Sequence, residues 1–190
     1  KLSIVTENGI SVEAHAPIIV SASRSTDIPG FYSDWFLHRM KVGYSAWINP
    51  FNGVKSYVSY QNTRLIVFWS KNPSHLLKEN GLIDYLQEKR INCYIQFTLN
   101  DYMNEGLERG VPSVKSRIET FKSLVSRLGF GKVIWRFDPL ILTDTIDVKT
   151  LLVKVKNIGD QLKGYTEKLV FSFADIDSYR KVKSNLEHNN

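Results

Sequence analysis

Short apolar runs alternate with segments whose apolar residues recur at helical spacing along most of this chain. The short runs are rich in Val, Ile and Phe and are mostly apolar on both faces, which is typical of strands in a covered parallel sheet. We expect strands at 18–23, 44–49, 64–70, 93–99, 132–138 and 168–174. The helical spacing predicts helices at 33–41, 74–90, 113–128, 148–162 and from 178 to about 186.

Two stretches depart from this alternation. In "LSIVTENGISVEAHAP", Asn8 and Gly9 lie between two strand-like runs, which predicts a two-residue hairpin turn within residues 1–16. The stretch "FNGVKSYVSYQNT", after "WINP", is too short and too β-like for a full helix, so we expect an extra strand or ribbon with one helical turn. We expect one domain over 1–190, with the hairpin followed by β/α units over 17–190.

Six β/α steps in one domain are compatible with an open doubly wound sheet or with a barrel. We expect an α/β fold of the incomplete TIM-like (β/α) barrel type, with about six parallel strands and an N-terminal β-hairpin. Eight units usually need about 250 residues, so an open wall should remain. A doubly wound sheet with reversed strand order would contradict this expectation.

Polar residues collect toward the ends of the expected strands. In "VIWRFDP", Arg136 and Asp138 are two residues apart and share one face of the strand, while Trp135 and Phe137 take the other face. Other strands carry polar residues in the same way at Ser21 and Ser23, at Gln96 and Thr98, less cleanly at Trp69 and Lys71, and at Ser172. Because function gathers at the carboxyl ends of parallel strands, we expect a shared polar mouth there.

The first expected strand is followed by the polar stretch within "SASRSTD", which contains a candidate anion-binding residue and a candidate catalytic residue. Arg24 carries a planar fork of donors that suits a carboxylate or a phosphate, and Arg136 is a second candidate of the same kind. Asp27 is a catalytic candidate, and the alternative is that it caps the turn before Pro29. Asp138 is a candidate general base.

The same residues also fit a purely structural network. In that alternative Arg136 pairs with Asp138 or Asp175 and the hydroxyls bond to the backbone, since buried charges persist only when they are paired. In either case we expect Arg136 and Asp138 to point into the barrel near its mouth. Their expected neighbours there are Gln96, Arg24 or Lys71.

Composition narrows the class of protein. The 190 residues are 43% hydrophobic and 12% aromatic, which is enough to bury a substantial core. No long apolar run or signal-peptide pattern is visible, so we expect a cytoplasmic protein without a membrane partner. Cys93 is the only cysteine and is expected to be a buried thiol, and the four histidines lack metal-site spacing, so no metal site is expected. There is no G-x-S-x-G, P-loop or G-x-G-x-x-G motif.

The net charge of +6 favours an anionic partner. We expect an anionic small molecule, and nucleic acid is the alternative that the charge alone supports. The lysines are spread along the chain, and several fit the solvated side of one helix: Lys149, Lys154, Lys156 and Lys163. The sequence does not predict an oligomeric state.

Five ordered motifs carry a resemblance to a known family. The chain has "VSASRSTDIPGFY", "WINPF", "VFWSKNP", "IQFTL" and "VIWRFDPL". They resemble "ISASR-TDIPAFY", "W-NPF", "VFWTKNP", "FQFTL" and "VIWRYDPI" of an uncharacterised bacterial family, domain of unknown function 1848. The resemblance runs from the hairpin to about Arg180. It implies a longer barrel protein whose C-terminal part carries a cysteine-rich motif similar to the cluster-binding loops of radical S-adenosylmethionine enzymes.

The resemblance and the strand pattern together give the candidate residues. The catalytic candidates are Asp138, Lys71 and Asp27. The substrate-binding candidates are Ser23, Arg24, Asn49, Asn72, Gln96, Thr98, Arg136 and Ser172. No cofactor is encoded in this chain, and the resemblance implies an iron–sulfur cluster and S-adenosylmethionine only together with the family's C-terminal part.

Three functions remain open at this point. The first is a redox or radical-type enzyme whose cluster the C-terminal part supplies. The second is a cluster-independent barrel enzyme that acts on a phosphorylated or carboxylated small molecule, with Arg24 and Arg136 holding the anion. The third is a nucleic-acid-binding module.

Overall fold

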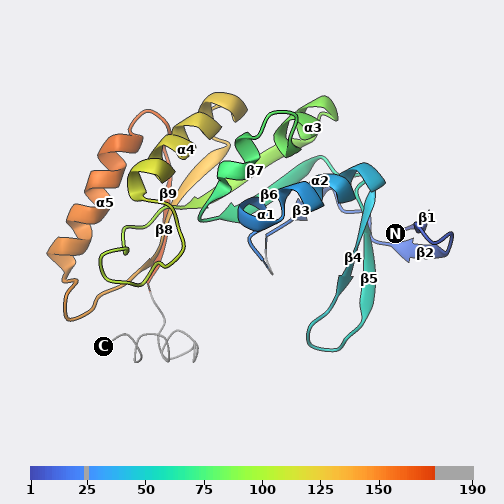
Figure 1. Ribbon diagram of the computed structural model, residues 1–190, viewed down its shortest axis with the longest axis horizontal. Helices are drawn as coiled ribbons and strands as arrows, with labels where there is room; N and C mark the ends of the chain where they lie inside the picture. Colours follow the sequence, from blue (N-terminus) through green and yellow to red (C-terminus); the bar gives the residue numbers. More distant parts are fainter. Residues whose placement is uncertain (24–25, 174–190) are drawn as a thin grey trace. The chain divides into compact units, whose positions relative to one another are not determined.

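The computed structural model describes residues 1–23 and 26–173 (Figure 1). The predicted residues Arg24 and Asp175 and the helix predicted from residue 178 lie outside the described residues. The chain divides into two compact units, Lys1–Ile95 and Gln96–Asn190, which are taken one at a time below. The single domain expected over residues 1–190 stays a prediction.

The chain forms a mixed α/β fold around a five-stranded parallel sheet. The strands lie in the order β3 (Ile19–Ser21), β6 (Leu65–Ser70), β7 (Asn92–Thr98), β8 (Val133–Leu140) and β9 (Leu169–Phe173). These five correspond to five of the six predicted strands. Their order follows the chain, so the described sheet lacks the reversal that would mark a doubly wound fold.

The sixth predicted strand, at 44–49, does not join this sheet, and the count of six is wrong. Those residues form β4 (Tyr44–Ile48), which pairs antiparallel with β5 (Lys55–Ser59) as a separate two-stranded ribbon (Figure 1). The Asn49 N–H donates to the Val54 carbonyl over 3.0 Å, so the chain reverses at once. A parallel neighbour needs a crossover of about a dozen residues, whereas a short turn can only make an antiparallel pair. The expected ribbon is confirmed, without its helical turn.

The N-terminal hairpin is confirmed, with a longer turn than expected. Strands β1 (Leu2–Val5) and β2 (Ser11–Ala14) pair antiparallel. The Thr6 N–H donates to the Ile10 carbonyl, and the Gly9 N–H donates to the Thr6 carbonyl, so the turn holds three residues rather than two. Gly9 takes a φ of 75°, the left-handed conformation that closes such three-residue turns.

Helices of the first unit are α1 (Ile28–Phe31), α2 (Ser33–Val42) and α3 (Leu82–Glu88), with a 3₁₀ helix η1 (Pro73–Leu77). The single helix predicted at 74–90 is therefore two shorter elements. The break falls at Gly81, where a Cβ atom would lie 2.7 Å from the Lys78 carbonyl oxygen. Phe36 of α2 joins the core, with ring centroids 5.8 Å from Phe68 of β6.

Helices α4 (Val114–Leu128) and α5 (Val148–Leu162) of the second unit match their predictions. Ser113 and Asp147 cap them by accepting backbone N–H bonds. The two helices pack together, and α4 contacts β8 (Figure 1). Phe97 of β7 stacks on Phe121 of α4, and Trp135 of β8 lies against Gly159 of α5. The opposite side of these strands is left for polar residues.

Candidate functional site

Four polar side chains of the second unit form one hydrogen-bonded group, made of the charge pair Arg136 and Asp138 with Gln96 and Ser172. Arg136 of β8 donates through Nε to the Asp138 Oδ2 atom over 3.2 Å, and its Nη2 donates to the same oxygen. The Nη1 atom of Arg136 donates to the Gln96 Oε1 atom over 2.6 Å. The Ser172 hydroxyl of β9 donates to the Asp138 Oδ1 atom. Residues from β7, β8 and β9 therefore converge on Asp138 and Arg136.

Strand alternation explains how the sequence places this pair. Trp135 and Phe137 are each at most 5% exposed on the helix-facing side, where Trp135 donates from Nε1 to the Leu99 carbonyl. Arg136 and Asp138 take the other side, with 13% and 14% of their side chains exposed. The expected reach of Arg136 to Gln96 is therefore present in the structure. The pair is largely withdrawn from water but not sealed, as a ligand site requires.

Asn100 holds the backbone of Asp138 from the end of β7. Its Oδ1 atom accepts from the Asp138 N–H over 2.9 Å, and its Nδ2 atom donates to the Asp138 carbonyl over 3.1 Å. A primary amide has the donor and acceptor of a peptide group, so Asn100 extends the strand pairing by one residue. Tyr102 continues it by donating to the Pro139 carbonyl and accepting from the Ile141 N–H.

A buried ion pair lies behind this amide. The Arg117 Nη1 atom lies 3.4 Å from the Glu108 Oε2 atom, and each side chain is 1% exposed. Arg117 also donates to the Asn100 carbonyl over 2.9 Å. Burial lowers the pKa of Arg117, while the Glu108 carboxylate opposes that change. Because a buried charge is tolerated only with such partners, the pair ties helix α4 to the loop that positions Asp138.

The sequence analysis missed Asn100, Glu108 and Arg117. Asn100 directly follows the strand "IQFTL", so its position at a strand end was a signal that could have found it. Glu108 and Arg117 are nine residues apart across a loop and a helix start, and no periodic pattern links them. Their pairing depends on how that loop folds.

Asp27 of the first unit has a different environment. Its Oδ1 atom accepts from the Gly30 N–H over 2.8 Å, so Asp27 is the N-cap residue of α1. Its Oδ2 atom accepts from the Ser70 hydroxyl over 2.8 Å and from the Lys71 N–H over 3.2 Å. The capping alternative for Asp27 is thus the geometry seen, and its catalytic role stays a prediction.

The remaining described candidates have contacts or surroundings of their own. Asn49 accepts from the Phe51 N–H at the tip of the β4–β5 ribbon. Asn72 accepts from the Ser74 hydroxyl at the start of η1. Thr98 is 3% exposed in β7, and the hydroxyl of Ser23 is buried with no hydrogen-bond partner among the described residues. Their substrate-binding roles stay predictions, as does that of Arg24.

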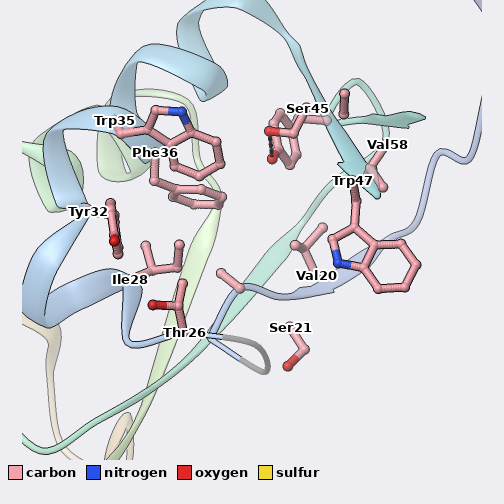
Figure 2. Close-up of a pocket in the computed structure, with 13 residues that line it drawn as sticks. Val20, Ser21, Thr26, Ile28, Tyr32, Trp35, Phe36, Ser45, Trp47 and Val58 are labelled. Carbon is pink, nitrogen blue, oxygen red and sulfur yellow. Dashed lines mark hydrogen bonds between the residues drawn. The ribbon is translucent and has the colours of Figure 1, made fainter. Parts of the chain in front are cut away.

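A hollow in the first unit was not foreseen from the sequence. It has a volume of about 570 Å³ and is bordered by β3, helices α1 and α2 and the β4–β5 ribbon. Figure 2 shows Tyr32, Trp35 and Phe36 on its helix side and Trp47 and Val58 on its ribbon side. Aromatic residues scattered over 32–60 meet here only through folding.

A comparison with family models gives one match. The model described as "Domain of unknown function (DUF1848)" matches residues 19–190, which is most of the chain. No curated protein and no solved structure matches this chain. Among the described residues, no group of His, Cys, Asp or Glu side chains could hold a metal ion, and no helix is long and apolar enough to cross a membrane.

Proposed function

The chain belongs to the family of domains of unknown function DUF1848, and we propose that it is an enzyme whose small anionic substrate binds at Arg136 and Asp138. One observation carries the proposal: Arg136 and Ser172, from neighbouring strands, both donate to one Asp138 carboxylate that is 14% exposed, and Gln96 of a third strand accepts from the same Arg136 guanidinium. Substrates of α/β enzymes bind at the carboxyl ends of the strands, where this group lies.

Arg136 is the residue that binds the anion in this proposal. Its guanidinium suits the two oxygens of a carboxylate or phosphate. Asp138 and Gln96 already hold the plane of the guanidinium, so binding costs little further side-chain entropy. The expected substrate is therefore a phosphorylated or carboxylated small molecule.

Asp138 is the general base, and Ser172 is its relay. A substrate hydroxyl gives its proton to the Ser172 Oγ atom, whose own proton already points to the Asp138 Oδ1 atom and passes to it. Proton abstraction from a substrate that also binds Arg136 is the reaction class that fits.

The proposal includes an incomplete TIM-like barrel. It is supported by parallel strands that follow the chain in order and by polar side chains at their carboxyl ends. Barrel enzymes share both features. An experimental structure in which the strands of the parallel sheet, β3, β6, β7, β8 and β9, curve around a common axis would support this part of the proposal, and a flat open sheet would refute it.

Cys93 gives no support to a cluster bound by this chain. It is buried and is the only cysteine, so the described residues do not fit an iron–sulfur cluster. A radical S-adenosylmethionine activity would need the ligands of the family's C-terminal part. Anaerobic iron and sulfide analysis of a longer homologue tests it, and a protein without iron would end that version. A chain with one cysteine has no internal disulfide, which suits a reducing cytoplasm, and we propose the cytoplasm as the location.

The anion site is tested by a thermal-shift screen. The melting temperature of the wild-type protein is measured with glycerol 3-phosphate, 3-phosphoglycerate, lactate and neutral glycerol. The three anions should raise it, and glycerol should not. Arg136→Gln should abolish that rise. Arg39→Gln is the matched control, because Arg39 also pairs with a carboxylate and its side chain is 14% exposed. Equal loss in both variants, or no rise with any anion, would reject the site.

Nucleic acid is the competing anion, and the same protein separates the two. A fluorescein-labelled DNA duplex is titrated at rising salt, since contacts to phosphates release counterions and weaken steeply. The nucleic-acid module would be favoured if the affinity for the duplex falls steeply as salt rises and is unchanged by Arg136→Gln, while none of the anions raises the melting temperature.

A further inference from the structure

We infer that the hollow between α1, α2 and the β4–β5 ribbon is a binding site for a small neutral aromatic molecule. It belongs to the first unit and shares no residue with the group around Arg136. The inference is independent of the proposed enzyme, since it rests on different residues and a different ligand chemistry.

Size is the first argument. The volume of about 570 Å³ lies within the range of roughly 300 to 1,000 Å³ that holds small ligands. The hollow is open on one side, and Trp35, Trp47 and Tyr32 at its border are 47%, 46% and 48% exposed. Three large aromatic side chains half in water around one hollow are a costly arrangement without an occupant.

Charge is the second argument. Within the part of the chain that the structure describes, thirteen residues line the hollow, and none of these is Asp, Glu, Lys, Arg or His, although the chain has a net charge of +6. A charged ligand would lose its hydration without gaining an ionic partner. The occupant is therefore neutral, unlike the anion proposed at Arg136.

Ring chemistry is the third argument. Tyr32, Trp35 and Phe36 face the hollow from the helices, and Trp47 borders it from the ribbon (Figure 2). Aromatic rings bind one another by offset stacking or edge-to-face contact, which adds to the gain from apolar burial. A planar ring between the helix side and the ribbon side makes both kinds of contact.

A pair of hydroxyls gives the site its polar end. The Ser45 Oγ atom lies 2.6 Å from the Tyr60 hydroxyl, and both residues border the hollow. Figure 2 labels Ser45 at this border. Burial raises the pKa of Tyr60, so its hydroxyl stays protonated at neutral pH. The pair can accept from, or donate to, one hydroxyl or carbonyl group on the ligand. The preferred ligand is thus an aromatic ring with one neutral polar substituent.

Three probes that share the naphthalene ring system but differ in charge test this site. The full chain is titrated by calorimetry with 2-naphthol, with 2-naphthoate and with 2-naphthylmethylammonium. We expect 2-naphthol to bind about tenfold more tightly than either charged probe. Tighter binding of 2-naphthoate or of the ammonium probe, or no binding of 2-naphthol, would overturn the inference.

Tryptophan variants locate the binding. Trp35→Ala and Trp47→Ala should each weaken 2-naphthol about fivefold to tenfold, because each removes one ring contact. Trp69→Ala is the matched control: Trp69 is 44% exposed and does not line the hollow. Circular dichroism checks that each variant folds. If Trp69→Ala weakens binding as much as the other two, the probe does not bind in the hollow and the inference fails.

A double variant tests the polar end. Ser45→Ala with Tyr60→Phe removes both hydroxyls, so no buried partner is left unpaired. It should weaken 2-naphthol about fivefold and leave 2-methylnaphthalene unchanged. Equal weakening of both probes would overturn the assigned polar end. If gel filtration instead shows a wild-type dimer that Trp35→Ala converts to a monomer, with no 2-naphthol binding, a second copy is the occupant and the inference is wrong.

Discussion

Asp27 and Asp138 are both aspartates that accept a hydrogen bond from a serine hydroxyl, yet their surroundings differ. The other partners of Asp27 are the backbone N–H groups of Gly30 and Lys71, so its carboxylate fixes the course of the chain. The other partner of Asp138 is the Arg136 guanidinium, while Asn100 holds the Asp138 backbone. The Asp138 side chain therefore does not hold the local backbone in place, because Asn100 does so instead.

This difference separates a structural carboxylate from a candidate functional one. A carboxylate that accepts from helix N–H groups has its oxygens committed to the fold. Where a neighbouring amide fixes the backbone instead, the carboxylate and its charged partner can exchange partners with a ligand without undoing the strand. The four experiments below test this contrast.

The largest effect should come from the ion pair behind Asn100. Glu108→Ala leaves the buried Arg117 without its carboxylate and should lower the free energy of unfolding by about 3–5 kcal/mol, measured in urea. The double variant Glu108→Leu/Arg117→Met should recover much of this loss. Glu7→Ala breaks the more exposed pair with Arg39 and should cost far less. Similar losses in the two single variants would show that no special support lies behind Asp138.

Asp138→Ala should have the next largest effect. It removes the charged acceptor of Arg136 and should cost about 2–3 kcal/mol, as for hydrogen bonds to charged groups. Asp138→Asn should keep most of the stability and lose the anion-dependent rise in melting temperature. If both variants lose equal stability while the rise persists, Asp138 is as structural as Asp27.

Asp27→Ala should cost less, about 1–2 kcal/mol, because it removes one N-cap and its link to Ser70. Asp27→Asn should regain the part of that loss that comes from the N-cap, since asparagine caps helices as well as aspartate does, whereas its Nδ2 group cannot accept from the Lys71 N–H. The anion-dependent thermal shift should be unchanged in both. A loss of that shift in a stable Asp27→Asn variant would instead support the predicted catalytic role of Asp27.

Tyr102 gives an effect confined to high pH. Burial raises its pKa above the ordinary value of 10.0, to about 12. The unfolded chain therefore loses the Tyr102 proton first, and stability that is fully present below pH 10 is lost as the pH rises toward 12. Tyr102→Phe should be less stable at pH 8, because it loses the bonds at Pro139 and Ile141, and should show a smaller further loss between pH 10 and 12. An unchanged alkaline profile in urea titrations would contradict this assignment.

Local patterns predicted much of the secondary structure. The apolar face of "IETFKSLVSRL" gives α4, and the capping residues Ser113 and Asp147 mark where α4 and α5 begin. The same local logic failed at 74–90, where the apolar spacing continues but the backbone breaks near Gly81. It also failed to show that β4 would pair with β5, because partner choice depends on the turn between them.

The alternation of one strand determined by itself that Arg136 and Asp138 share a face opposite Trp135 and Phe137, because successive side chains of any strand point to opposite sides. Only the tertiary structure decided what meets them: Gln96 and Ser172 from neighbouring strands, and Asn100 backed by Glu108 and Arg117. The aromatic hollow has the same origin, since Trp35 and Trp47 are on a helix and a ribbon whose approach no local pattern encodes. Periodicity is a property of a few consecutive residues, whereas these contacts depend on loop closure and burial across long stretches of chain.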